Sequence, residues 1–159
     1  MTSPEGIEIR AMDASHGAAA LAVLTRAIRA TEGAQYTTSQ VEAWLSGMGV
    51  TRLSAHLEEC VALGAFDGQD LLGFATYVSA TEALEFLYVN PAAWRRGVAR
   101  RLVAAIEGHA RRLGATRVRV DASLLARSAL ERMGYAVIEA YQKHARGESF
   151  DNAWLSKAL

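Results

Sequence analysis

The sequence is short of cysteine, of proline and of any excess charge, and two of these shortages exclude whole classes of site or partner. Cys60 is the only cysteine, so an internal disulfide and a cysteine-cluster metal site are both excluded. It lies in an apolar run, where a thiol usually packs as a small hydrophobe. Lys and Arg number 17, as do Asp and Glu. The chain therefore has no overall attraction to nucleic acid or to an anionic membrane.

Segments that mark membrane, secreted and disordered proteins are also missing. No apolar run reaches the roughly 18 residues of a membrane span, and residues 1–10 have no basic-then-apolar signal pattern. Hydrophobic residues make up 51% of the 159, which argues against disorder. The four histidines show no metal-ligand spacing. We expect a cytoplasmic protein with a single domain over residues 1–159, no metal, and neither a nucleic-acid nor a membrane partner.

Hydrophobic periodicity predicts alternating strands and helices. Strands are expected at residues 7–12, 59–66, 71–79, 83–89, 116–120, 135–144 and 149–156. Helices are expected at about residues 14–30, 96–113 and 124–133, and another is expected between a cap at Thr38 or Ser39 and a stop at Gly47. This order predicts a mixed sheet with helices on its faces. The strands at 83–89 and 116–120 flank a long helix and should therefore be parallel.

The segment with the clearest chemistry leads from one of these strands into the long helix, which begins near Gly97. The first turn of a helix has unpaired backbone N–H groups and roughly half a positive charge, which suits a pyrophosphate. Gly97 has no Cβ to block a phosphate, and Ala99 is small. Arginines add cationic donors, namely Arg95, Arg96 and Arg100. A solvated basic helix start with a glycine cap is the alternative interpretation.

The same segment resembles the acetyl-CoA motif of the GNAT acetyltransferase superfamily. Residues 87–91, Leu-Tyr-Val-Asn-Pro, are similar to the family's aromatic-Val-x-Pro strand end. Gly97 and Ala99 match the two small positions of its Gln/Arg-x-x-Gly-x-Gly/Ala motif. Trp94 departs from that motif, which has Gln or Arg there, and Arg95 is the nearest polar substitute.

Two later segments extend the resemblance over most of the chain. Residues 121–126 with Gly134-Tyr135 resemble the family's Ala-Ser-x-x-Ala and Gly-Phe positions, and residues 153–159 resemble the ending of bacterial members. The resemblance implies an α/β GNAT fold: a mixed, mostly antiparallel sheet of about seven strands, splayed between the fourth and fifth, with four helices.

The resemblance also implies an acetyl-CoA-dependent N-acetyltransferase. The acetyl group would pass directly to a primary amine of a small molecule or a protein within a ternary complex, and relatives often form a homodimer. Acetyl-CoA would lie between the splayed strands. The residues implied to bind it are Leu87, Tyr88, Val89, Arg95, Arg96, Gly97, Val98, Ala99, Arg100, Ser123 and Ala126.

Direct transfer to an amine needs a base for the amine proton and is helped by an acid at the thiolate. Glu85 is the candidate base, with Glu82 the weaker alternative. The family's usual acid is a tyrosine, and Leu130 stands at that position. The remaining candidates for the acid are Ser123, Ser128 and Tyr141. Alternatively the thiolate leaves unassisted, since a thiol pKa near 8.5 makes it a fair leaving group.

The family's first two helices and last hairpin form the acceptor site, so aromatic residues there are candidates to bind the substrate. They are Tyr36, Trp44 and Tyr77, and packing in the core is the alternative for each. Two other functions stay open: an acyl-CoA-binding module that has lost catalysis, and a nucleotide binder. The second lacks both the Gly-x-x-x-x-Gly-Lys-Ser/Thr loop and the Gly-x-Gly-x-x-Gly turn.

Overall fold

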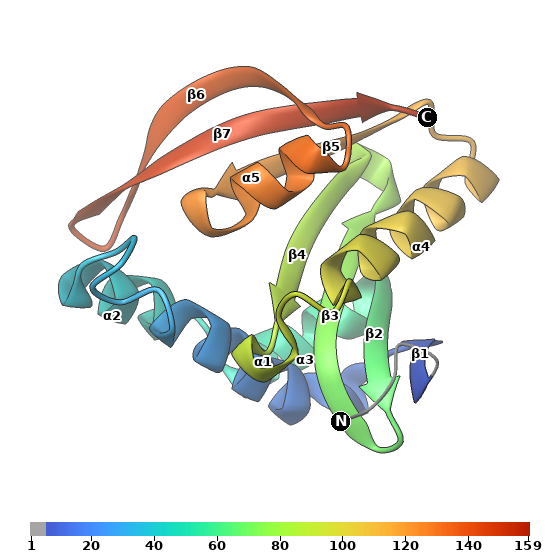
Figure 1. Cartoon of the computed structure of the whole chain (residues 1–159), viewed down its shortest axis with the longest axis horizontal. Helices are drawn as coiled ribbons and strands as arrows, with labels where there is room; N and C mark the ends of the chain where they lie inside the picture. Colours follow the sequence, from blue (N-terminus) through green and yellow to red (C-terminus); the bar gives the residue numbers. More distant parts are fainter. Residues whose placement is uncertain (1–5) are drawn as a thin grey trace.

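The computed structural model describes residues 6–159, which form one mixed sheet flanked by helices (Figure 1). The strand order is β1-β2-β3-β4-β5-β7-β6. The strands are β1 (Ile7–Ala11), β2 (Val61–Asp67), β3 (Asp70–Val78), β4 (Ala83–Val89), β5 (Arg117–Ser123), β6 (Ala136–Ala145) and β7 (Glu148–Ala158). The helices are α1 (Gly17–Arg29), α2 (Thr38–Ser46), α3 (Val50–Glu59), α4 (Val98–Arg112) and α5 (Leu124–Arg132). The predicted mixed α/β architecture is confirmed.

Helix α3 is a correction to the sequence prediction, because residues 6–159 contain five α-helices where four are expected. Its N-cap is Gly49, and no side chain caps its first turn. It therefore lacks the Ser, Thr, Asp or Asn that usually marks a helix start. Its buried residues are Leu53 and Leu57, one helical turn apart. Glu59 ends this helix, so β2 begins later than predicted, at Val61.

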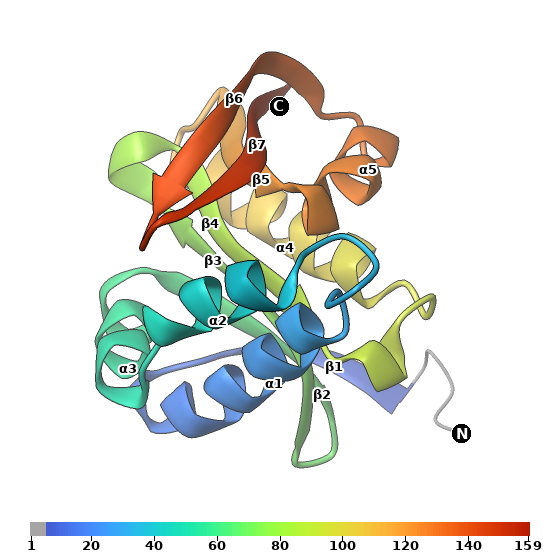
Figure 2. The ribbon, with the colours of Figure 1, turned by 90° about the vertical axis from the view of Figure 1, so that its left-hand side faces the viewer.

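The two faces of the sheet carry separate cores. Helices α1 and α3 pack on one face and α4 on the other (Figure 2). The buried stripe of α4 contains Leu102 and Ile106, which cluster with Ala75 and Leu84 of the sheet. On the other face, Phe74 clusters with apolar side chains of α1 and α3. The sheet is thus the middle layer of three, which holds β4 rigidly between two packed faces.

Strands β4 and β5 are paired over only two residues of each strand. Their parallel pairing joins Ala83 to Arg119 and Leu84 to Val120, and the two strands then diverge (Figure 1). Both the parallel orientation and the expected splay are confirmed. The β6–β7 hairpin extends beyond β5 toward α2, where the Gln40 side-chain amide donates to the Ser149 carbonyl over 2.7 Å. The opening between the strands is therefore bridged at its far side.

The packing of α4 makes a stability prediction. Ile106 is fully buried, and truncating such a side chain removes apolar contacts and leaves a cavity. Ile106→Ala should therefore lower the free energy of unfolding by about 2–5 kcal/mol. Leu113, at the end of the same helix, is 57% exposed, so Leu113→Ala should change it little. Urea unfolding of both variants checks this, and equal losses would contradict the assigned core.

Candidate active site

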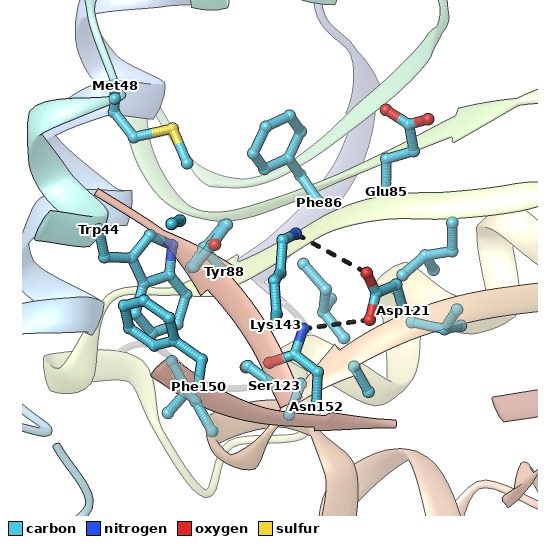
Figure 3. Close-up of a pocket in the computed structure, with 18 of the residues that line it drawn as sticks. Trp44, Met48, Glu85, Phe86, Tyr88, Asp121, Ser123, Lys143, Phe150 and Asn152 are labelled. Carbon is cyan, nitrogen blue, oxygen red and sulfur yellow. Dashed lines mark hydrogen bonds and ion pairs between the residues drawn. The ribbon is translucent and has the colours of Figure 1, made fainter. Parts of the chain in front are cut away.

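An open cleft of about 380 Å³ lies where β4 and β5 diverge (Figure 3). Its walls come from the end of α2, from β4 and β5, from the start of α5 and from the β6–β7 hairpin. Large apolar side chains line one part of it: Trp44, Met48, Phe86, Tyr88 and Phe150. Five charged residues also line it: Arg52, Glu85, Asp121, Lys143 and Arg146. The cleft can therefore hold a molecule with both apolar and charged parts.

Glu85 enters this cleft because β4 has a bulge there. Thr76 pairs with Phe86, whereas Tyr77 pairs with Leu84, so Glu85 is an extra residue without a partner on β3. The Phe86 amide donates to the Thr76 hydroxyl over 3.1 Å. A bulge redirects the side chain of the extra residue. The result is a carboxylate that faces the cleft.

His56 of α3 lies next to Glu85, and the sequence pattern does not predict this pairing. Its Nε2 is 2.9 Å from the Thr76 hydroxyl and 3.9 Å from Glu85 Oε2. Burial lowers the pKa of His56; Glu85 and Glu59 oppose this effect, and Arg52 adds to it. The imidazole is therefore neutral near pH 7 and can accept a proton. Both side chains line a recess of about 110 Å³ that shares Arg52 with the larger cleft.

Asp121, on β5, is the centre of a second polar cluster in the cleft. Its Oδ2 accepts a hydrogen bond from the Tyr141 hydroxyl over 2.6 Å, and its Oδ1 accepts one from Asn152 over 3.1 Å. Lys143 lies 3.7 Å from the same carboxylate (Figure 3). Burial and the bond to Asp121 raise the pKa of Tyr141 to about 12. Tyr141 is therefore a weak acid, and its hydroxyl is already engaged in a hydrogen bond to Asp121.

The start of α4 is exposed and has no capping side chain. Gly97 is its N-cap with φ of 75°, a left-handed conformation that favours glycine. A Cβ built on Gly97 would meet no atom within 4 Å. The first turn of α4 is thus uncapped by a side chain and has open space beside Gly97, as an anion site requires. This loop lies beyond the residues that line the 380 Å³ cleft.

Strand β4 connects the cleft to that loop through backbone groups that do not pair with β3. The Asn90 amide donates to the Leu72 carbonyl of β3 over 2.7 Å. Because backbone groups alternate in direction along a strand, those of Leu87 and Val89 face away from β3, toward the opening. The Val89 carbonyl accepts a hydrogen bond from the Trp94 indole over 2.8 Å. Trp94, the departure from the family motif, therefore holds the end of β4.

Known proteins share both the sequence pattern and the fold. The model of the acetyltransferase (GNAT) family matches residues 23–135, which is more than half of the chain. The chain belongs to this family.

Three individual proteins illustrate the likeness. The chain is 26% identical over 134 residues, 84% of each chain, to the Escherichia coli K12 protein named uncharacterized N-acetyltransferase YafP. A GCN5-related N-acetyltransferase structure from Rhodopseudomonas palustris is 27% identical, with a TM-score of 0.90 over 100% of this chain and 98% of that one. PaiA N-acetyltransferase from Thermoplasma acidophilum, solved in complex with coenzyme A, is 19% identical, with a TM-score of 0.78 over 96% and 99%.

In this GNAT acetyltransferase, the structure brings only part of the predicted site together. Six of the predicted residues line the cleft: Trp44, Glu85, Leu87, Tyr88, Ser123 and Ala126. Tyr141 does not line it, although its hydroxyl donates to Asp121, which does. Val89 and the residues from Arg95 to Arg100 lie outside this cleft, toward the start of α4.

Two predicted aromatic residues do not line the cleft. Tyr77 is 1% exposed and belongs to the core under α4, so its placement as a substrate-binding residue is corrected. The alternation of β3 directs Thr76 toward His56 and Tyr77 toward the opposite face. Tyr36 is 3% exposed and packs edge-on against Trp44 at 5.3 Å. It supports the cleft wall without contributing surface to it.

Within residues 6–159, no helix is long and apolar enough to cross a membrane. In the same part of the chain, no group of three or more His, Cys, Asp or Glu side chains is arranged to hold a metal ion. Burial raises the pKa of the Cys60 thiol to about 11, so this cysteine is a poor nucleophile.

Proposed function

We propose that this protein transfers the acetyl group of acetyl-CoA to a primary amine within a ternary complex, as a single domain. One observation carries the proposal: β4 and β5 separate beyond Leu84, so the backbone groups of Leu87 and the amide of Val89, which face away from β3, have no partner strand in the opening. Along β4, the extended distance from Glu85 to Val89 is roughly 13 Å at about 3.3 Å per residue. This edge can align an extended pantetheine arm.

The proposed donor site follows from this alignment. The diphosphate of acetyl-CoA would accept hydrogen bonds from the first amides of α4, beyond Gly97, with Arg95, Arg96 and Arg100 as cationic neighbours. The thioester would then lie near Glu85, at the other end of the aligned arm. Ser123 and Ala126 line the cleft opposite β4 and would contact the donor near its sulfur. The coenzyme A bound to the Thermoplasma acidophilum relative supports this choice of donor.

The proposed reaction forms a C–N bond and breaks the C–S bond of the thioester. The amine nitrogen attacks the carbonyl carbon, and the electron pair of the C–S bond leaves with sulfur. Glu85 accepts the proton that the amine loses, and His56, 3.9 Å from Glu85, is the next proton acceptor. The thiolate takes a proton from water or from Ser123. Tyr141 is a poor proton donor to the thiolate, because its hydroxyl already donates a hydrogen bond to Asp121.

An acyl-CoA-binding module without catalysis is the second candidate. Leu130 is fully buried, and it provides no hydroxyl where the family usually has its tyrosine. Calorimetry with acetyl-CoA and a thiol-release assay over a panel of amines separate the two functions. Binding with thiol release supports the enzyme. Binding without release on any amine supports the module, and failure to bind acetyl-CoA contradicts both.

The pKa of His56 predicts the pH dependence of the enzyme. Burial lowers this pKa from 6.5, so the ring loses its ability to accept a proton only as the pH falls below that value. The ratio of kcat/KM between wild type and His56→Gln should be roughly tenfold near pH 7 and should fall toward one as the pH drops well below 6.5. Taking this ratio removes the protonation of the substrate amine from the comparison. A ratio that does not change with pH would eliminate His56 from the proton pathway.

A further inference from the structure

Two arginines from different elements meet at the end of α2. The Arg52 guanidinium, on α3, donates to the Gly47 carbonyl over 3.2 Å. The Arg146 guanidinium, from the β6–β7 turn, packs against the Cα of the same residue. A Cβ added to Gly47 would lie only 2.5 Å from Arg146 Cζ. The absence of a side chain at Gly47 therefore leaves room for the Arg146 guanidinium, and both arginines line the cleft.

Neither arginine has an acidic partner within residues 6–159, where every ion pair involves other residues. The two carboxylates of the cleft are engaged elsewhere, Glu85 beside His56 and Asp121 within its own cluster. Two guanidinium groups have about ten N–H donors between them. The negative end of α2 attracts these charges but offers few acceptors. Both side chains are exposed, so water hydrates the remaining donors, and an anion in the cleft would replace that water.

The position of Arg52 indicates that this anion would lie close to the reacting amine. Arg52, His56 and Glu85 line the same recess of about 110 Å³. A molecule whose amine lies at Glu85 therefore has Arg52 within the same small space. A guanidinium binds a carboxylate through two parallel hydrogen bonds, which suits a compact anion. The apolar wall of the cleft next to this recess includes Trp44 and Phe86.

We propose that the acceptor is a small amine that also carries a carboxylate and an apolar side group, the chemistry of a free aromatic or long aliphatic α-amino acid. This inference rests on the proposed acetyltransferase function. Arg52 and Arg146 bind the carboxylate, the aromatic wall holds the side group, and the amine faces Glu85. A protein amine lacks a carboxylate beside it, so the proposal selects the small-molecule class of acceptor.

The test uses three acceptors that share a phenyl group and a primary amine. They are phenylalanine, phenylalaninamide, in which the carboxylate is neutralised, and phenethylamine, which has none. In Arg146→Gln, the KM for phenylalanine should rise about tenfold to a hundredfold, as expected for loss of a charge-assisted hydrogen bond. The KM for the other two should stay within about threefold. Because each acceptor is compared with itself, differences in amine basicity cancel.

Two further variants separate the effect of moving the Arg146 guanidinium from the effect of removing a positive charge. Gly47→Ala keeps both arginines but displaces the Arg146 guanidinium, and the backbone of Gly47 at φ of −86° accepts alanine. It should raise the KM for phenylalanine alone, by less than Arg146→Gln does. Arg132→Gln removes an exposed arginine of α5 that does not line the cleft and should leave all three KM values unchanged. Calorimetry of phenylalanine against the coenzyme A complex provides a readout that needs no turnover.

The outcomes distinguish this inference from the proposed function. Equal effects of Arg146→Gln on all three acceptors, or no effect, would overturn the carboxylate site while leaving the acetyltransferase intact. Turnover of phenethylamine with no turnover of phenylalanine would overturn it as well. Binding of acetyl-CoA with none of the three acetylated would exclude this acceptor class. Failure of the wild type to bind acetyl-CoA would refute the proposed function itself.

Discussion

Glu85→Gln should lower kcat by about a hundredfold to ten-thousandfold, the range that a general base contributes, while the affinity for acetyl-CoA stays nearly unchanged. The substitution keeps the size of the side chain and its place on the β4 bulge. It removes the cleft carboxylate that lies beside His56. The loss should fall on kcat because the carboxylate acts on the amine during transfer. Steady-state kinetics and calorimetry measure the two effects separately.

Glu82 provides the matched control for this variant. It lies just before the same strand, at a left-handed φ of 54°, and pairs with Arg117 at 3.7 Å. It does not line the cleft, so Glu82→Gln should leave kcat within about threefold of the wild type. A normal rate for Glu85→Gln at every pH would mean that Glu85 is only a solvent-facing strand residue. Equal losses in both variants would point to a general effect on the sheet.

The local features of the proposed donor site could be predicted from the sequence. The bounds of β4 agree residue for residue with the prediction at 83–89, because Asn90-Pro91 stops a strand and the apolar run before it is continuous. The left-handed Gly97 at the start of α4 is likewise a local signal. Such features depend on neighbouring residues, whose spacing is visible along the chain.

The acceptor side could not be predicted in the same way, because it is assembled from distant segments. His56 meets Glu85 only because α3 packs against β2 and its imidazole reaches across to Thr76 and Glu85, and α3 itself has no capping signal. Arg52 and Arg146 meet only because the β6–β7 turn reaches the end of α2. Tyr77 is the reverse case, a residue that the sequence prediction placed in the cleft and the structure places elsewhere. An aromatic residue in the right strand was expected in the cleft, but strand alternation turns it into the other core.

Gly97→Glu should abolish detectable binding of acetyl-CoA. The new carboxylate would occupy the open space in front of the first amides of α4, where the diphosphate is proposed to bind. Two unit charges of the same sign about 4 Å apart near a protein surface repel by about 4 kcal/mol, which corresponds to roughly a thousandfold in affinity. The added bulk also blocks the approach to the amides. Calorimetry with acetyl-CoA measures the loss directly.

Gly114→Glu separates this effect from backbone strain. Gly114 follows the other end of α4, also with a positive φ, 86°, and also with no atom within 4 Å of an added Cβ. The strain of a side chain in the left-handed region, about 1–2 kcal/mol, is therefore similar in both variants. If the anion site is the cause, only the variant at Gly97 loses acetyl-CoA, and urea unfolding shows similar stability for both. Unchanged affinity in Gly97→Glu would place the diphosphate elsewhere, and equal losses in both would assign the effect to strain in α4.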